Sequence, residues 1–170
     1  MRLLPLAAAL LALSLPLAAC NRKPPVDPAV AAKTLADGQA FLAKNKTAPG
    51  VITLPDGLQY KVIRSGPATG ASPGRRDEVK VHYEGKLLNG DVFDSSFDRG
   101  APATFQLNGL IPAWIEAMQK MKPGDEWQVW APADLAYGDE DKGPIPANSV
   151  LDFRIPLIDF LPASQPTANG

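Results

Sequence analysis

The chain contains few of the residues that crosslink a fold or carry metal chemistry. Its 170 residues include one cysteine, Cys20, and one histidine, His82. Because the only thiol lies near the amino terminus, the folded part has no disulfide and depends on its hydrophobic core for stability. One histidine and one cysteine also exclude a zinc site of the usual ligand set and a Cys–His nucleophile pair.

An excess of charge of one sign is also absent. The 17 lysines and arginines nearly match the 18 aspartates and glutamates, whereas a nucleic-acid surface needs a clustered basic excess. We therefore expect no nucleic-acid partner. No glycine-rich loop resembles a phosphate cradle, and nothing in the sequence implies a cofactor.

The one long hydrophobic run lies at the amino terminus and is typical of a processing segment. Arg2 precedes an apolar stretch over 3–17 that is too short for a comfortable membrane span. Residues 17–20, Leu-Ala-Ala-Cys, resemble a bacterial lipobox, so we expect a signal peptide over 1–19 and lipidation of Cys20. The alternative is an ordinary secretory signal whose cysteine lies near the cleavage site by chance.

The residue after the cysteine bears on the destination of the protein. Asn21 stands there instead of aspartate, which suits outer-membrane sorting in bacteria with two membranes. We expect an exported protein, anchored by acylated Cys20 at the periplasmic face of the outer membrane or at the cell surface. Residues 20–50 are predicted to comprise this cysteine, a tether and a short helix.

The short helix has clear boundary signals. Asp27 and Pro28 are typical of an N-cap and a first helical position, and the alanine-rich stretch that follows to about Lys44 ends before Pro49. Gly38 weakens the helix by about 1 kcal/mol relative to alanine. The helix can pack on the domain or on a second copy. Since so few residues are available for a dimerisation arm, we expect a monomer.

Residues 51–160 are predicted to form one α+β domain, an antiparallel sheet of five or six strands wrapped around one short helix. The helix is expected over 111–121, with Trp114 on the face that meets the concave side of the sheet. Pro156 lies within the last strand and predicts an edge position or a bulge there. A disordered tail is expected over 161–170. Alternating patterns predict strands over 58–63, 78–84, 91–93, 103–107, 126–131 and 150–160.

Five short motifs combine aromatic residues with a few polar ones. They are Val-His-Tyr-Glu-Gly at 81–85, Val-Phe-Asp-Ser-Ser at 92–96, Ile-Pro-Ala-Trp at 111–114, Leu-Ala-Tyr-Gly at 135–138 and Ile-Pro-Ala-Asn-Ser-Val-Leu-Asp-Phe at 145–153. Their order and spacing resemble those of the FKBP-type peptidyl-prolyl isomerases, and the resemblance covers roughly residues 51–159. The lead-in over 54–62 is similar to the exported bacterial branch, which includes the macrophage infectivity potentiator proteins.

The resemblance implies a peptidyl-prolyl cis-trans isomerase that acts on X-Pro segments of exported polypeptides and binds the macrolide inhibitors of the family. Arg99 would keep Asp94 ionised, and Ile111 would offer its backbone N–H to a ligand. The residues with an implied catalytic role are Asp94, Tyr137 and Trp114, the last as the pocket floor. Those with an implied substrate-binding role are Tyr83, Phe93, Arg99, Phe105, Leu110, Ile111, Ile145 and Phe153.

A pocket of this kind has apolar walls, few polar tips and no reagent. It suits rotation about a prolyl peptide bond, which needs only a changed environment. One departure leaves a second function open, because Ala103 stands where the family has an aromatic residue near the pocket rim. The alternative function is a non-catalytic peptide-binding or chaperone module on the same fold.

Overall fold

The computed structural model describes residues 26–164, so the predicted signal peptide, Cys20 and most of the predicted tail lie outside the described residues. Within this range no helix is both long enough and apolar enough to cross a membrane. The helices are α1 (Pro28–Asn45) and α2 (Pro112–Met118), with the single turns η1 (Leu107–Gly109) and η2 (Ala133–Leu135). The strands are β1 (Val51–Thr53), β2 (Gln59–Arg64), β3 (Glu78–Val81), β4 (Glu84–Leu87), β5 (Val92–Ser95), β6 (Ala103–Gln106), β7 (Glu126–Ala131) and β8 (Leu151–Leu161).

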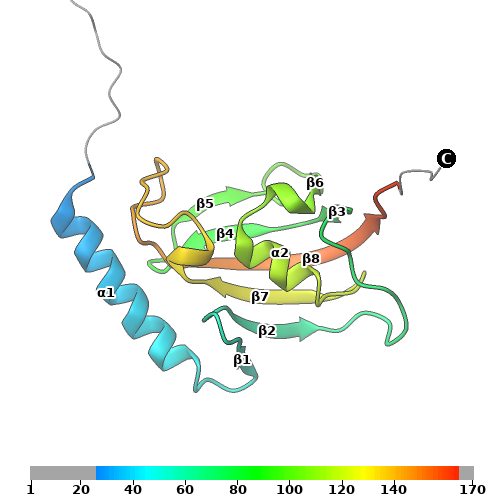
Figure 1. The fold of residues 1–170 in the computed structure, drawn as a ribbon, viewed down its shortest axis with the longest axis horizontal. Helices are drawn as coiled ribbons and strands as arrows, with labels where there is room; N and C mark the ends of the chain where they lie inside the picture. The colour runs from blue at the N-terminus through cyan, green and yellow to red at the C-terminus, as the bar shows by residue number, and fades with distance from the viewer. Residues whose placement is uncertain (1–25, 165–170) are drawn as a thin grey trace, which may run out of the picture.

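All eight strands belong to one antiparallel sheet (Figure 1). The order is β1-β2-β7-β8-β3-β6, and the hairpin of β4 and β5 joins the sheet through β4 and β8. The predicted α+β class is confirmed. The strand count exceeds the five or six expected, because the three-residue β1 is too short to show alternation and the stretch 78–84 divides into β3 and β4. His82 and Tyr83 lie at this division.

Strand β8 is central, so Pro156 does not lie at an edge. The alternative expectation, a bulge, agrees better with the structure, because the pairing of β8 with β3 passes from Leu157 to Asp159 and skips one residue of β8. One side of β8 pairs with β7, and the other passes from β4 to β3. The Pro156 carbonyl accepts a hydrogen bond from the His82 N–H at 3.1 Å. In a regular antiparallel pair the return bond would run from the N–H of residue 156 to the His82 carbonyl. Pro156 has no N–H, so this bond is missing at the junction between β3 and β4. A register shift follows where β3 passes from Lys80 to Val81.

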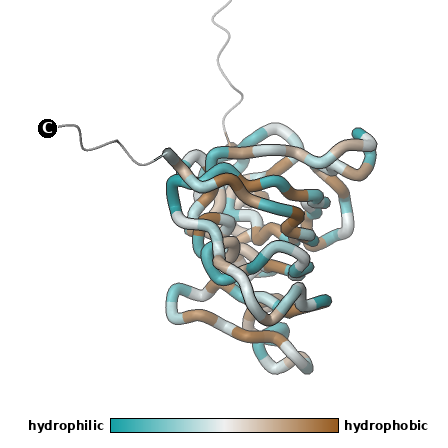
Figure 2. Tube along the Cα trace, turned by 90° about the vertical axis from the view of Figure 1, so that its right-hand side faces the viewer, coloured by the Kyte–Doolittle hydropathy of each residue, from teal (hydrophilic) through white to brown (hydrophobic). Residues whose placement is uncertain are grey.

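Helix α2 lies across the concave face of the sheet and is nearly all buried. Trp114 is 4% exposed and packs in one core with Met118, Val129 and Phe153, as the helical spacing predicts. The helix ends at Met118, one turn earlier than predicted. Hydrophobic and hydrophilic positions alternate over short distances along the chain (Figure 2), which is the pattern of strands with one buried face.

Helix α1 packs on its own domain. The buried Gln59 side chain donates to the Leu42 carbonyl and accepts from Asn45, both at 2.9 Å. Gly38 is the one buried residue of α1, and a Cβ atom there would lie 2.8 Å from Cγ2 of Val150. The glycine that weakens the isolated helix thus permits its close approach to the sheet.

Candidate functional site

A pocket of about 250 Å3 opens between α2, β5, β6 and the loop after η2. The structure brings every predicted site residue into its lining except Arg99 and Ile145. The lining also contains Gly109, which the sequence did not single out. The lining residues are Tyr83, Phe93, Asp94, Phe105, Gly109, Leu110, Ile111, Trp114, Tyr137 and Phe153.

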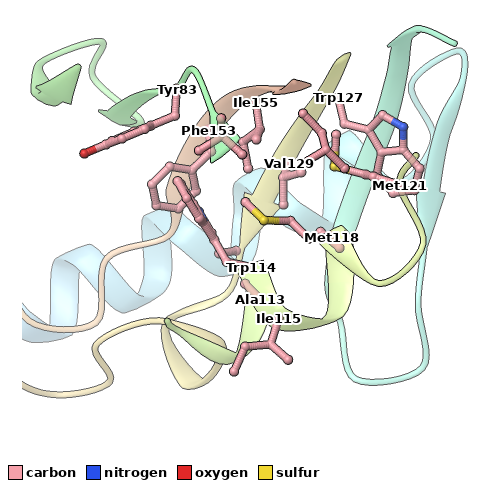
Figure 3. Packing of buried hydrophobic residues seen from close by; sticks show 14 of the residues in the cluster. Tyr83, Ala113, Trp114, Ile115, Met118, Met121, Trp127, Val129, Phe153 and Ile155 are labelled. Atoms are coloured by element: carbon pink, nitrogen blue, oxygen red, sulfur yellow. The ribbon is translucent and has the colours of Figure 1, made fainter. Parts of the chain in front are cut away.

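The indole of Trp114 lies at the centre of the aromatic group. Its ring meets those of Tyr83 and Phe153 edge to face, at centroid distances of 5.2 and 5.3 Å (Figure 3). Phe105 lies 6.0 Å away at an interplanar angle of 78°. Edge-to-face packing is the favoured geometry for aromatic rings. The Trp114 Nε1 atom is buried and has no hydrogen-bond partner within residues 26–164.

One wall of the pocket depends on a glycine that the sequence analysis missed. Phe93 and Phe153 meet edge to face at 5.8 Å, above Gly85 of β4. A Cβ atom at Gly85 would lie 2.6 Å from Cζ of Phe93 and 3.0 Å from Cε1 of Phe153. A glycine inside a strand pattern is itself a signal of close approach, so the sequence contained the information.

The polar end of the pocket is a cluster of Tyr83, Asp94 and Arg99. The Tyr83 hydroxyl donates to one carboxylate oxygen of Asp94, and the Arg99 guanidinium binds the other. Arg99 also donates to the Tyr83 oxygen at 2.8 Å, and its Cζ atom lies 5.4 Å from the centre of the Tyr83 ring. Arg99 therefore acts on the pocket from outside its lining.

The cluster determines the ionisation of its members. Burial raises the pKa of Asp94. The hydrogen bonds from Tyr83 and Arg99 lower the pKa by more than burial raises it, so the net pKa lies below the ordinary aspartate value. Burial, assisted by Asp94, raises the pKa of Tyr83. At neutral pH the pocket thus holds a paired carboxylate and a neutral phenol.

Two hydrogen-bond donors in the lining are unpaired. The Tyr137 hydroxyl and the Ile111 backbone N–H form no hydrogen bond with any residue of the described range. Tyr137 is 37% exposed in the loop after η2, and Ile111 is the N-cap residue of α2. Both are available to the carbonyl group of a ligand.

Two residues of the sequence analysis lie outside the lining. Ile145 is 6% exposed and belongs to the hydrophobic core. Ala103 begins β6 opposite Val81 and packs against the same core. Ala103 is absent from the pocket lining, so its side chain forms no wall of this pocket. The arrangement as a whole can enclose an apolar ring and bind a carbonyl oxygen, and it presents no nucleophile to a substrate.

Comparisons with known proteins agree with this geometry. Residues 70–158 match the model of the FKBP-type peptidyl-prolyl cis-trans isomerase family, and residues 21–62 match that of the domain amino-terminal to such isomerases. The chain is 52% identical over 130 residues to the outer membrane protein MIP of Legionella longbeachae, covering 76% of this chain and 55% of the relative.

Two further relatives extend the comparison. The peptidyl-prolyl cis-trans isomerase Mip of Coxiella burnetii is 52% identical over 121 residues, which are 71% of this chain and 52% of that protein. The crystal structure of FkpA from Escherichia coli superposes with a TM-score of 0.76 at 38% identity, covering 80% of this chain and 63% of that chain. The chain thus spans about half the length of these curated relatives.

Proposed function

The chain belongs to the FKBP-type peptidyl-prolyl cis-trans isomerase family, and on this premise we propose that it catalyses the cis–trans isomerisation of X-Pro bonds in exported polypeptides. The observation that carries the proposal is the pocket of about 250 Å3, which has Trp114 as its floor and unpaired donors at its rim.

The chemistry requires a changed environment and no reagent. Rotation about a peptide C–N bond faces a barrier of about 18–20 kcal/mol, because resonance is lost in the twisted state. The twisted amide carries less charge separation than the planar one. An apolar pocket that receives the prolyl ring over Trp114 therefore disfavours the planar ground state relative to the transition state.

Polar groups at the rim add differential binding. The Tyr137 hydroxyl and the Ile111 N–H would donate to substrate carbonyl groups, and a donor placed for the rotated carbonyl favours the transition state. Asp94, held ionised by Tyr83 and Arg99, would supply a fixed negative charge beside the twisting bond. In this reading Asp94, Tyr137 and Trp114 are the catalytic residues, and the other lining residues bind substrate.

A protease-coupled assay on short Xaa-Pro peptides tests the proposal. The protein would be the chain from residue 20 onward with Cys20→Ser, which removes the predicted lipid site and keeps the whole described fold. We expect faster cis-to-trans conversion that is abolished by a macrolide inhibitor of the family. Peptide binding without acceleration would decide for the non-catalytic module.

The cellular location is a second part of the proposal. We propose that residues 1–19 are a signal peptide and that acylated Cys20 anchors the isomerase domain, residues 51–160, to the outer membrane. The Leu-Ala-Ala-Cys sequence at 17–20 supports this, as does the outer-membrane name of the Legionella relative. Fractionation of cells tests it, since Cys20→Ser should move the protein from the membrane to the soluble fraction.

A further inference from the structure

The junction between β3 and β4 contains an unusual strand pair. Ser96, just after β5, donates its N–H to the Tyr83 carbonyl at 2.9 Å, as in a regular antiparallel pair. The return bond differs, because the Tyr83 N–H donates to the hydroxyl Oγ of Ser96 at 2.8 Å and not to its carbonyl. The side chain of Ser96 therefore takes the place of a backbone acceptor.

Because the hydroxyl of Ser96 replaces its carbonyl as the acceptor, the chain can leave the sheet without losing the hydrogen bond from the Tyr83 N–H. Strand β5 ends at Ser95, and the turn that follows is closed by a hydrogen bond from Gly100 N–H to the Phe97 carbonyl at 2.9 Å. The turn carries Arg99 back to the pocket, where it contacts Tyr83 and Asp94. One hydroxyl thus lies between the backbone of Tyr83 and the start of the turn that delivers Arg99.

The Ser96 hydroxyl is fully enclosed. Ser96 is 0% exposed, and its Oγ atom also lies 3.2 Å from the Tyr83 carbonyl oxygen and 3.0 Å from Nδ1 of His82. A buried N–H that loses its acceptor has no water to replace it. Without this hydroxyl, the Tyr83 backbone must therefore move to satisfy its N–H.

We infer that Ser96 is a positioning residue of the pocket, whose hydroxyl holds the Tyr83 backbone so that the phenol reaches Asp94 and Arg99. Ser96 is absent from the pocket lining, and Tyr83 is the lining residue that its hydroxyl contacts. The effect on catalysis rests on the proposed function, whereas the effect on the Tyr83–Asp94–Arg99 cluster does not. The two can therefore be measured separately.

The first measurement is the titration of Asp94 by carboxyl carbon NMR in Ser96→Ala. Because Tyr83 is one of the groups that lower the pKa of Asp94, its displacement should raise that pKa toward the ordinary value of about 3.9. The matched control is Ser149→Ala, another buried serine with one hydrogen bond, to the Pro146 carbonyl at 2.6 Å. This control should leave the titration unchanged.

The second measurement is kcat/KM for an Xaa-Pro peptide. We expect Ser96→Ala to lower it about tenfold, the equivalent of one lost buried hydrogen bond, and Ser149→Ala to leave it within about twofold. In a double-mutant cycle with Tyr83→Phe, Ser96→Ala should cost little further activity, because its effect passes through the phenol. Additive losses would overturn the inference in favour of a purely structural role.

A matched pair of variants keeps the test decisive if Ser96→Ala does not fold. Ser96→Thr and Ser96→Val add the same volume and differ only in the hydroxyl group. We expect the threonine variant to keep the low pKa of Asp94 and the valine variant to lose it. Equal titrations in the two would refute the inference. An inactive wild type would overturn the proposed function and leave these titrations to decide the role of Ser96.

Discussion

Replacement of Trp114 by leucine tests whether the indole is a functional floor or only part of the core. Trp114 is 4% exposed and meets three aromatic rings. Alanine is a poor probe here, because Trp→Ala in a core costs about 3–5 kcal/mol and can unfold a protein whose total stability is about 5–15 kcal/mol. Leucine keeps the site apolar and mostly filled.

The expected cost in stability follows from the contacts of the indole. Trp114→Leu buries roughly 80 Å2 less apolar surface, which costs about 2 kcal/mol at about 25 cal/mol per Å2. The lost edge-to-face contacts add about 0.5–1.5 kcal/mol each. Against this, the variant removes a buried Nε1–H that has no acceptor in the described structure, which recovers about 1–3 kcal/mol. The middle of these ranges gives a net loss of about 3 kcal/mol, which is below the usual total stability of about 5–15 kcal/mol and should leave the protein folded.

Trp114→Leu should also lower the activity, because the indole is the proposed floor under the substrate proline. A substrate proline that loses roughly 60–110 Å2 of apolar contact with the indole loses about 1.5–2.8 kcal/mol of binding. If that contact is strongest in the twisted state, kcat/KM falls about tenfold to a hundredfold. The assay is isomerisation of an Xaa-Pro peptide, run beside urea unfolding of the same preparation.

Trp127 supplies a matched control. It is 5% exposed, its Nε1 is also buried without a partner within the described residues, and it stacks on Tyr60 at 4.1 Å. It lies at the other end of the core, beyond Val129 (Figure 3), and outside the pocket lining. Trp127→Leu should cost a similar amount of stability and leave kcat/KM unchanged. Equal losses of activity in both variants would refute the reasoning.

Three further predictions concern glycine contacts and pH. Gly85→Ala places a Cβ atom 2.6 Å from Cζ of Phe93 and should lower the free energy of unfolding in urea by about 1–3 kcal/mol. The displaced Phe93 ring should also weaken macrolide binding, and an unchanged affinity would contradict this. Gly38→Ala should lower the thermal midpoint in calorimetry, because the clash with Val150, at about 1–3 kcal/mol, outweighs the helix propensity gain of about 1 kcal/mol; a raised midpoint would show that α1 does not pack as described. Because the folded pKa of Asp94 is lowered, the unfolded state binds more protons near and below the unfolded pKa of about 3.9. The free energy of unfolding, measured by urea titration, should be compared between the wild type and Asp94→Asn. The advantage of the wild type should be constant above about pH 5 and shrink as the pH falls through about 4. A constant advantage down to about pH 3 would be inconsistent with an ionised, paired Asp94.

Local pattern predicted much of the fold. The spacing of Trp114 and Met118 placed the buried face of α2 correctly, and the alternation over 126–131 placed β7. It failed where pairing partners decide the outcome. The unbroken alternation at 78–84 predicted one strand, but β8 exchanges β4 for β3 at Tyr83. Pro156 indicated an edge or a bulge, and it lies in a central strand opposite that exchange, next to a register shift.

For the pocket, too, the sequence predicted some features and missed others. The resemblance in the motifs named most of its lining, because those motifs contain the aromatic residues themselves. It did not name Gly85 or Ser96 as contributors, since their roles depend on which atoms approach them from other strands. Ile145 was assigned to the pocket by its motif, but the closed loop places it in the core.

Composition, periodicity and motif order by themselves determined the class of this domain, the family resemblance and the chemical character of its site, because these properties depend on residue types and on their spacing along the chain. Tertiary structure alone decided that α1 docks on the sheet through Gly38 and that a hydroxyl replaces a carbonyl opposite Tyr83. Each of these depends on the distance between two segments that the fold brings together, and no local sequence pattern records such a distance.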